Sequence, residues 1–192
     1  MNGKKKAKVF TIPNLLSALR IVLAFAFLVV FYKEIKNKQI YLGMILLVSA
    51  VSDALDGKIA RRFDMVTELG KILDPIADKL TQIVLLVCML PGYPSILPVL
   101  ILFFVKEVTV ALSGAFVLMK TGNNGGAKWY GKMSTAVFYI VMLSLLLFPQ
   151  IPDKAAQIMI YVSGFFILFA FFMYMRLFVI LLKRQRNKEE RL

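Results

Sequence analysis

Four aspartates near the middle of the chain have the spacing of paired ligands on two helices. Asp53 and Asp56 are three residues apart and Asp74 and Asp78 are four apart, so each pair shares one face of an α-helix. An antiparallel helix pair would bring all four carboxylates to one depth. Four negative charges at low dielectric repel one another unless cations neutralise them. Because carboxylate oxygens are hard ligands, the pattern predicts Mg²⁺ or Mn²⁺ at this site.

Any acid–base chemistry in this chain must proceed without histidine. The sequence has no histidine and one cysteine, Cys88, which lies in an apolar run. Zinc therefore has few ligands here, and proton transfer falls to carboxylates, lysines or tyrosines. We expect Cys88 to be a small buried hydrophobic residue without a disulfide partner.

Small residues and an arginine accompany the first aspartate pair. Gly57 and Ala60 continue the helix face of Asp53 and Asp56, and they leave a recess where a ligand can approach the backbone. Arg61 follows, with a planar fork of donors that suits a phosphate. Carboxylates, metal, recess and arginine together predict a diphosphate site, where metal ions would stabilise a leaving phosphate.

Each aspartate also has an ordinary structural explanation. Asp74 before Pro75 resembles the cap and first residue of a helix, and neighbouring lysines could hold other aspartates in solvated ion pairs. Asp64 and Glu68 lie in the turn between the two predicted helices, where we expect them to be solvated. Four aspartates at these spacings inside membrane helices nevertheless favour a functional site.

The composition indicates a membrane protein. Of the 192 residues, 59% are hydrophobic and only 18% are charged, which is fewer charges than an average soluble domain carries. The apolar run from Leu15 to Tyr32 is broken only by Ser17 and Arg20. A run of this length argues against the alternative, a soluble all-α domain with a large core.

Apolar runs predict an all-α integral membrane protein with a bundle of six transmembrane helices. A helix of about 20 residues crosses the hydrocarbon core. Short breaks rich in Pro, Gly, Asn and Lys separate the runs, and no soluble domain fits between them, so we expect one membrane domain over residues 1–192. The predicted spans are 13–32, 39–61, 70–91, 95–119, 130–149 and 155–182.

Basic residues at both ends predict the orientation. Four lysines lie in residues 1–8 and five basic residues lie in 183–191, so an even number of spans places both termini in the cytoplasm. The three lysines of residues 33–38 are an exception. We attribute the net charge of +13 to topology and to attraction for anionic lipids, and we expect no nucleic-acid partner. The prediction is a multi-pass protein of the cell membrane.

The aspartates are predicted to lie at cytoplasmic helix ends. The apolar runs 40–52 and 80–90 are each too short to cross a bilayer alone. Each reaches the required length only if its helix continues into the acidic segment. We therefore expect two membrane helices that meet across a turn around Phe63 to Leu69, with the site facing the cytoplasm.

The acidic segment resembles the signature of the CDP-alcohol phosphotransferase family. Eight fixed positions match, and the chain length and six predicted spans agree, so the resemblance covers essentially the whole chain. The family transfers a phosphatidyl or similar group from a CDP-linked donor to an alcohol and releases CMP. The matching residues are Asp53-x-x-Asp56-Gly57-x-x-Ala60-Arg61, eight residues, then Gly70-x-x-x-Asp74-x-x-x-Asp78.

This resemblance implies roles for individual residues. Asp53, Asp56 and Asp74 would be metal ligands, with Asp74 shared between two ions. Asp78 would bind the second ion and deprotonate the acceptor hydroxyl. A homodimer is also implied, with the acyl chains of the donor in the bilayer among membrane lipids. The residues that would contact or make room for the CDP group are Gly57, Ala60, Arg61, Thr67, Asn14 and Ser17.

Two further patterns concern the acceptor. Ile12-Pro13-Asn14-Leu15-Leu16-Ser17-x-x-Arg20 and Gly131-Lys132-x-x-Thr135 resemble phosphatidylglycerophosphate synthases of the family, which implies CDP-diacylglycerol as donor and glycerol-3-phosphate as acceptor. The family's Arg-Glu pair in the fourth helix appears here as Lys106-Glu107. Cardiolipin synthases, which use phosphatidylglycerol as acceptor, share much of the first pattern, and serine or inositol-phosphate acceptors are further alternatives.

A glycerol-3-phosphate acceptor requires a cationic pocket. We expect four basic residues to supply it at the cytoplasmic side, although Lys106 could pair with an acid of the bundle and Lys128 could only mark topology. The candidates are Arg20, Lys106, Lys128 and Lys132.

A different functional class stays open at this point. Carboxylates inside membranes also occur in cation-coupled transporters, and membrane prenyltransferases bind metal-diphosphates through aspartates. The position of the aspartates at helix ends and the Gly-x-x-Ala-Arg spacing argue against a transporter. The single dense signature and the short bundle argue against a prenyltransferase.

Overall fold

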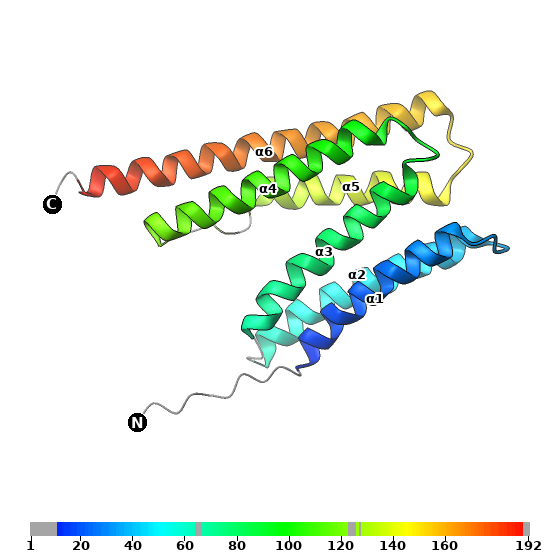
Figure 1. The fold of residues 1–192 in the computed structure, drawn as a ribbon, viewed down its shortest axis with the longest axis horizontal. Coiled ribbons are helices and arrows are strands. Elements are labelled where there is room, and N and C mark those ends of the chain that lie inside the picture. Colours follow the sequence, from blue (N-terminus) through cyan, green and yellow to red (C-terminus); the bar gives the residue numbers. More distant parts are fainter. Residues whose placement is uncertain (1–10, 64–66, 123–125, 127, 190–192) are drawn as a thin grey trace. The chain divides into compact units, whose positions relative to one another are not determined.

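The structure is a computed structural model that describes residues 11–63, 67–122, 126 and 128–189. Within these residues the chain forms six α-helices and no strand, as Figure 1 shows. Their bounds are α1 Ile12–Tyr32, α2 Lys38–Arg62, α3 Glu68–Met89, α4 Ile96–Thr121, α5 Trp129–Leu147 and α6 Asp153–Glu189.

Each helix lies on one of the six predicted segments, so the all-helical fold is confirmed. The bounds of α1 differ from the prediction by one residue, because an apolar run and its flanking breaks define that helix clearly. Helix α6 continues seven residues past the predicted end at 182. The added residues 183–189 are polar but contain no glycine or proline, and most of them favour a helix.

Four of the helices are long and apolar enough to cross a membrane by length and composition. Among the residues that the structure describes, these are α1, α4, α5 and α6. Helices α2 and α3 carry the aspartates within their length, Asp53 and Asp56 on α2 and Asp74 and Asp78 on α3. The helices are thus typical of a membrane protein, while the count of six spans stays a prediction.

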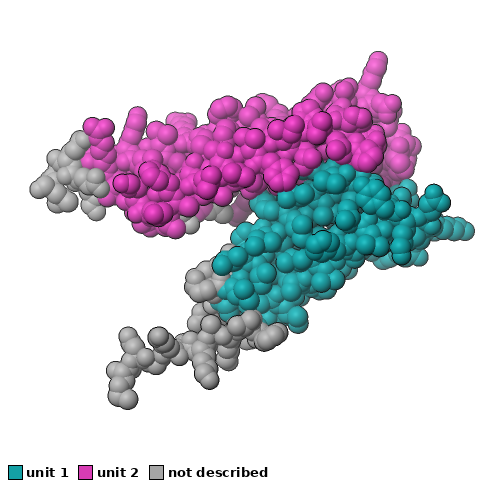
Figure 2. All heavy atoms as spheres, in the orientation of Figure 1, with its two compact units in different colours: residues 1–89 teal, residues 90–192 magenta. Residues whose placement is uncertain are grey.

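The helices form two compact units, residues 1–89 and 90–192, which Figure 2 shows in different colours. In the first unit α1 packs against both α2 and α3. In the second unit α6 packs against both α4 and α5. One domain over residues 1–192 stays a prediction.

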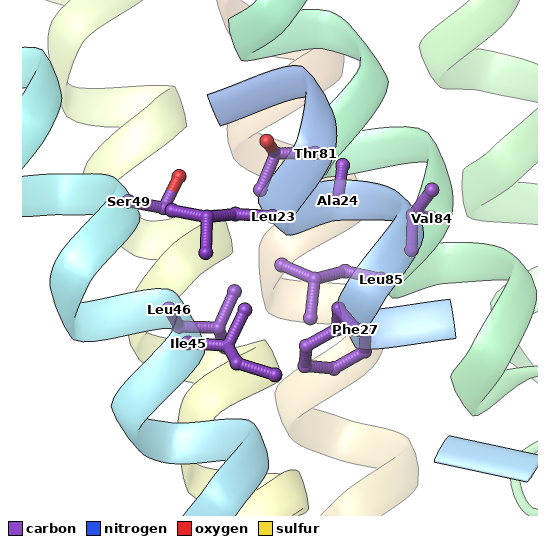
Figure 3. A pocket seen from close by; sticks show the side chains of 9 residues that line it. All are labelled: Leu23, Ala24, Phe27, Ile45, Leu46, Ser49, Thr81, Val84 and Leu85. Carbon is purple, nitrogen blue, oxygen red and sulfur yellow. The ribbon is translucent and has the colours of Figure 1, made fainter. Parts of the chain in front are cut away.

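Mostly apolar side chains from three helices, with Ser49 and Thr81 among them, line the interior of the first unit (Figure 3). Phe27 of α1 and Leu85 of α3 are buried, and the space among these side chains has no room for a water molecule. This packing fixes α1 against α2 and α3. The side chains are Leu23, Ala24 and Phe27 of α1, Ile45, Leu46 and Ser49 of α2, and Thr81, Val84 and Leu85 of α3.

A glycine allows helices α5 and α6 to approach closely in the second unit. A Cβ atom on Gly131 would lie 2.5 Å from the Tyr174 hydroxyl oxygen and 3.2 Å from two carbons of its ring. The ring of Tyr130 holds Tyr174 from another side, edge to face at 4.8 Å between centroids. The phenol of Tyr174 therefore occupies the space that a larger residue would need.

Replacing Gly131 by alanine should destabilise the protein. The rigid ring of Tyr174 must shift, and overpacking of this kind costs about 1–3 kcal/mol, or a fall in Tm of about 2–12 °C for a chain of this size. Gly114→Ala is the matched control, because its Cβ would stand 3.4 Å from Phe178, an ordinary contact. Thermal unfolding followed by circular dichroism in detergent measures both variants. Equal melting temperatures for the two would contradict the contact with Tyr174.

Candidate active site

A buried polar stripe runs along the first half of α1. Asn14, Ser17 and Arg20 follow one another at intervals of three residues and are all buried. Ala24 and Phe27 continue the same face into the apolar interior of the first unit. The face of α1 that packs against α2 and α3 is therefore polar at its start and apolar beyond.

Arg20 binds both aspartates of α2. Its Nη1 donates to Asp53 Oδ1, and its Nη2 lies 2.9 Å from Asp56 Oδ2. The guanidinium and Asp56 are buried, whereas the Asp53 side chain is exposed. One guanidinium reaches both carboxylates because residues three apart share a helix face, as the spacing predicts.

Asp74 of α3 joins the same cluster. Its Oδ1 accepts a hydrogen bond from Ser17 Oγ and lies 3.8 Å from Arg20 Nη2. The Ser17 hydroxyl also lies 3.0 Å from the Pro13 carbonyl oxygen, so its single hydrogen has two acceptors available. Three of the four predicted metal ligands thus meet at one arginine.

The fourth aspartate, Asp78, lies one turn beyond Asp74 on the same face of α3. Its Oδ2 is 3.6 Å from Lys79 Nζ, and its side chain is about one-third exposed. A partly exposed carboxylate next to the cluster is placed where a substrate group can approach it.

Thr67 caps the start of α3 and connects it to α1. Its Oγ1 accepts from the Gly70 amide at 3.0 Å and donates to Asn14 Oδ1 at 2.9 Å. A Cβ on Gly70 would lie 2.7 Å from Asn14 Oδ1 and 3.1 Å from Thr67 Oγ1. Gly70 is therefore the residue type that leaves room for the bond between Asn14 and Thr67.

The explanation of Asp74 as a helix cap is wrong. Helix α3 begins at Glu68, so Asp74 and Pro75 lie inside it. Pro75 suggested that the helix begins at Asp74, but the helix begins after Thr67, about two turns earlier. Asp74 is consequently free of any capping role and faces Ser17 and Arg20.

Several predicted residues lie partly or wholly outside the description. Helix α2 contains Gly57, Ala60 and Arg61, but the structure does not describe what their side chains contact. Asp64 lies outside the described residues. The recess and the phosphate contact of Arg61 therefore stay predictions. Glu68, expected in the turn, is the first residue of α3.

The three predicted acceptor-binding lysines all belong to the second unit. Lys106 is buried on α4 and its Nζ bonds Glu107 Oε1, so it pairs with an acid while its role toward the acceptor stays a prediction. Lys128 immediately precedes α5, and Lys132 is exposed in the first turn of that helix. Arg20 belongs to the first unit, where it forms ion pairs with Asp53 and Asp56.

The sequence did not predict the roles that Ser17 and Arg20 have here. Both were expected to contact a substrate, and the structure directs both to aspartates of neighbouring helices. A signal was available, because they are the only interruptions of a long apolar run and lie three residues apart. Polar residues on one face of a membrane helix require partners on the helices that cover that face.

The aspartate cluster has the donor chemistry of a divalent-cation site. In the described part of the chain no three acidic or cysteine side chains already converge as ligands of one ion. However, three carboxylates gather around one guanidinium among the described side chains. Oxygen ligands of this kind fit a hard divalent ion, although its binding stays a prediction.

Comparisons with known proteins agree with the signature. The model of a family described as CDP-alcohol phosphatidyltransferase matches residues 10–181. A protein of Escherichia coli strain K12 named CDP-diacylglycerol--glycerol-3-phosphate 3-phosphatidyltransferase is 30% identical over 155 residues, which are 79% of this chain and 85% of that protein. A protein of the same name from Shigella flexneri serotype 5b is 30% identical over 74% of this chain and 80% of its own length.

Gly70→Ala should weaken the connection between α1 and α3. The new methyl group displaces Asn14 Oδ1 or Thr67 Oγ1, at a cost of about 1–3 kcal/mol from overpacking and a lost buried hydrogen bond. The measurement is thermal unfolding of Gly70→Ala, Asn14→Ala and the double variant. Since Asn14→Ala removes the closest contact, the alanine at position 70 should cost less in that background. Strictly additive effects would show that Asn14 is not the obstacle.

Proposed function

We propose that this chain, which belongs to the CDP-alcohol phosphatidyltransferase family, transfers the phosphatidyl group of CDP-diacylglycerol to glycerol-3-phosphate, with phosphatidylglycerophosphate and CMP as products. The relatives named for this reaction align with most of the chain. The observation that carries the proposal is the meeting of three signature aspartates from two helices at one buried arginine.

The reaction needs a base and a leaving group. The acceptor hydroxyl attacks the β-phosphorus, the bond from this phosphorus to the bridging oxygen breaks, and CMP leaves with that oxygen. Asp78 takes the hydroxyl proton. Its position one turn from Asp74 and its partial exposure support this role, and the absence of histidine from the sequence leaves carboxylates as the natural bases.

Members of this family generally depend on divalent metal ions. Here Asp53, Asp56, Asp74 and Asp78 would hold two ions, Mg²⁺ or Mn²⁺. When bound, such ions supply positive charge beside the phosphate that departs with CMP. The gathering of three carboxylates from two helices supports this assignment.

The donor is proposed to bind beside the aspartates of α2. Gly57 and Ala60 would give room to the CDP group and Arg61 would bind its phosphate. Three polar residues at the junction of α1 and α3 would line the same side while holding the two helices together. They are Asn14, Ser17 and Thr67.

We further propose one six-span membrane domain, with both termini and the site in the cytoplasm of a cell-membrane protein, assembled as a homodimer. Cytidine and ions would reach the site from the water, while the acyl chains stay in the bilayer. Four apolar helices and the basic termini support the membrane spans and their orientation, and the family resemblance implies the homodimer.

Glycerol-3-phosphate is favoured as acceptor by the names of the relatives. No observation favours phosphatidylglycerol, serine or inositol-phosphate in its place, or a transporter. Lys106, Lys128 and Lys132 are proposed to attract the acceptor phosphate. Because Arg20 is paired with Asp53 and Asp56, it is not proposed to bind the acceptor.

Purified protein supplied with CDP-diacylglycerol, Mg²⁺ and glycerol-3-phosphate should release CMP and form phosphatidylglycerophosphate. EDTA should stop the reaction, because the aspartates then lack their metal ions. Chromatography of nucleotides and lipids measures both products. Failure to release CMP with any acceptor would remove the enzyme proposal, and turnover with phosphatidylglycerol but not glycerol-3-phosphate would overturn the acceptor.

Asp78→Asn should lower turnover by about 100-fold or more, because the amide cannot accept the acceptor proton. Binding of CDP-diacylglycerol should change much less, since three other aspartates remain. Initial rates and donor binding by titration measure the two effects separately. Asp153→Asn, an exposed substitution at the start of α6, is the control and should keep full activity. An active Asp78→Asn enzyme would exclude Asp78 as the base.

A further inference from the structure

We propose that Arg20 is a positioning residue, a resident counter-charge that holds the metal-binding aspartates together while no metal ion is bound. This inference rests on the proposed metal site of the function above. It replaces the expectation that Arg20 binds the acceptor.

Arg20 is buried inside the first unit. The residue is only 2% exposed, and an arginine is almost never buried so completely unless it is paired. Its two terminal nitrogens point to carboxylates, while Nε has no hydrogen-bond partner among the described residues. The guanidinium is thus held by the aspartates, and burial keeps it away from the solvent side by which a soluble acceptor would arrive.

Arg20 connects three helices. Arg20 on α1 contacts Asp53 and Asp56 on α2 and approaches Asp74 on α3. Ser17, one turn earlier on α1, donates to the same oxygen of Asp74 that Arg20 approaches. A planar fork can serve carboxylates on two helices at once, whereas the single ammonium of a lysine is a point charge.

Arg20 brings a positive charge into a cluster of carboxylates. Loss of Arg20 would remove a buried positive charge from its place among three carboxylates of two helices. Divalent ions would relieve the repulsion among these carboxylates, so the loss of Arg20 should matter most when metal is absent. A residue that only fills space would matter equally in both states, and a residue that only binds acceptor would matter in neither.

The test compares thermal stability in EDTA and in excess Mg²⁺. Arg20→Met keeps the length without the charge, and Arg20→Lys keeps the charge without the fork. In EDTA the melting temperature of Arg20→Met should fall by about 10 °C, as for a broken buried ion pair in a chain of this size. Excess Mg²⁺ should recover at least half of that fall. Arg20→Lys should show the same pattern with a smaller amplitude.

Arg176→Met, at an exposed arginine of α6, is the matched control and should change little in either condition. An equal fall with and without Mg²⁺ would reduce Arg20 to packing and overturn the proposal. Unchanged stability together with a raised KM for glycerol-3-phosphate would also overturn it, in favour of acceptor binding. If Arg20→Met does not fold even with Mg²⁺, the melting temperatures of Arg20→Lys in EDTA and in Mg²⁺ are compared instead. An equal fall of the melting temperature in both conditions would overturn the proposal.

The melting experiment contains no substrate, so its outcome is independent of the proposed reaction. If the wild-type protein forms no phosphatidylglycerophosphate, the proposed function is wrong. If the Arg20 variants still show the metal-dependent loss of stability, the proposed role of Arg20 holds all the same. The reverse result would leave the reaction intact and return Arg20 to a structural residue.

Discussion

The burial of one guanidinium among carboxylates is the interaction on which the first unit depends. A charge inside a chain that is 59% hydrophobic is costly unless it is paired. Arg20 meets this requirement with aspartates from α2 and α3, so the three helices must stand in a fixed register for the charge to be satisfied. The apolar interior around Phe27 maintains this register along the rest of α1.

The same interaction explains why the site lies where polar and apolar packing meet. Along one face of α1 the buried residues change from Ser17 and Arg20 to Ala24 and Phe27 within three turns. The clustered carboxylates and the guanidinium therefore adjoin a packed apolar interior, which favours holding several side chains in one arrangement. The bond from Thr67 to Asn14 secures the other end of this contact, at the start of α3.

The sequence predicted the helices well and the contacts between them poorly. The apolar run of α1 and its flanking breaks placed that helix to within one residue, but hydropathy alone missed the polar end of α6, since a helix can continue beyond the membrane. Helical spacing placed Asp53 and Asp56 on one face. The contacts of Arg20 with Asp53 and Asp56 join residues 33 and 36 positions apart, and only the packing of α1 on α2 determines them. No periodicity within one helix contains that information.

The position of Arg20 also imposes an order of events on biosynthesis. Helix α1 is made before α2 and α3, and its arginine has no carboxylate partner on α1 itself. On insertion scales an unpaired arginine at the centre of an inserting helix costs about 2.5–3.5 kcal/mol, which the surrounding leucine, valine and phenylalanine must offset until α2 emerges. The cluster is completed only when Asp74 has been synthesised. The first unit therefore reaches its native pairing as a whole, and a chain interrupted before α3 would carry an arginine with an incomplete set of partners.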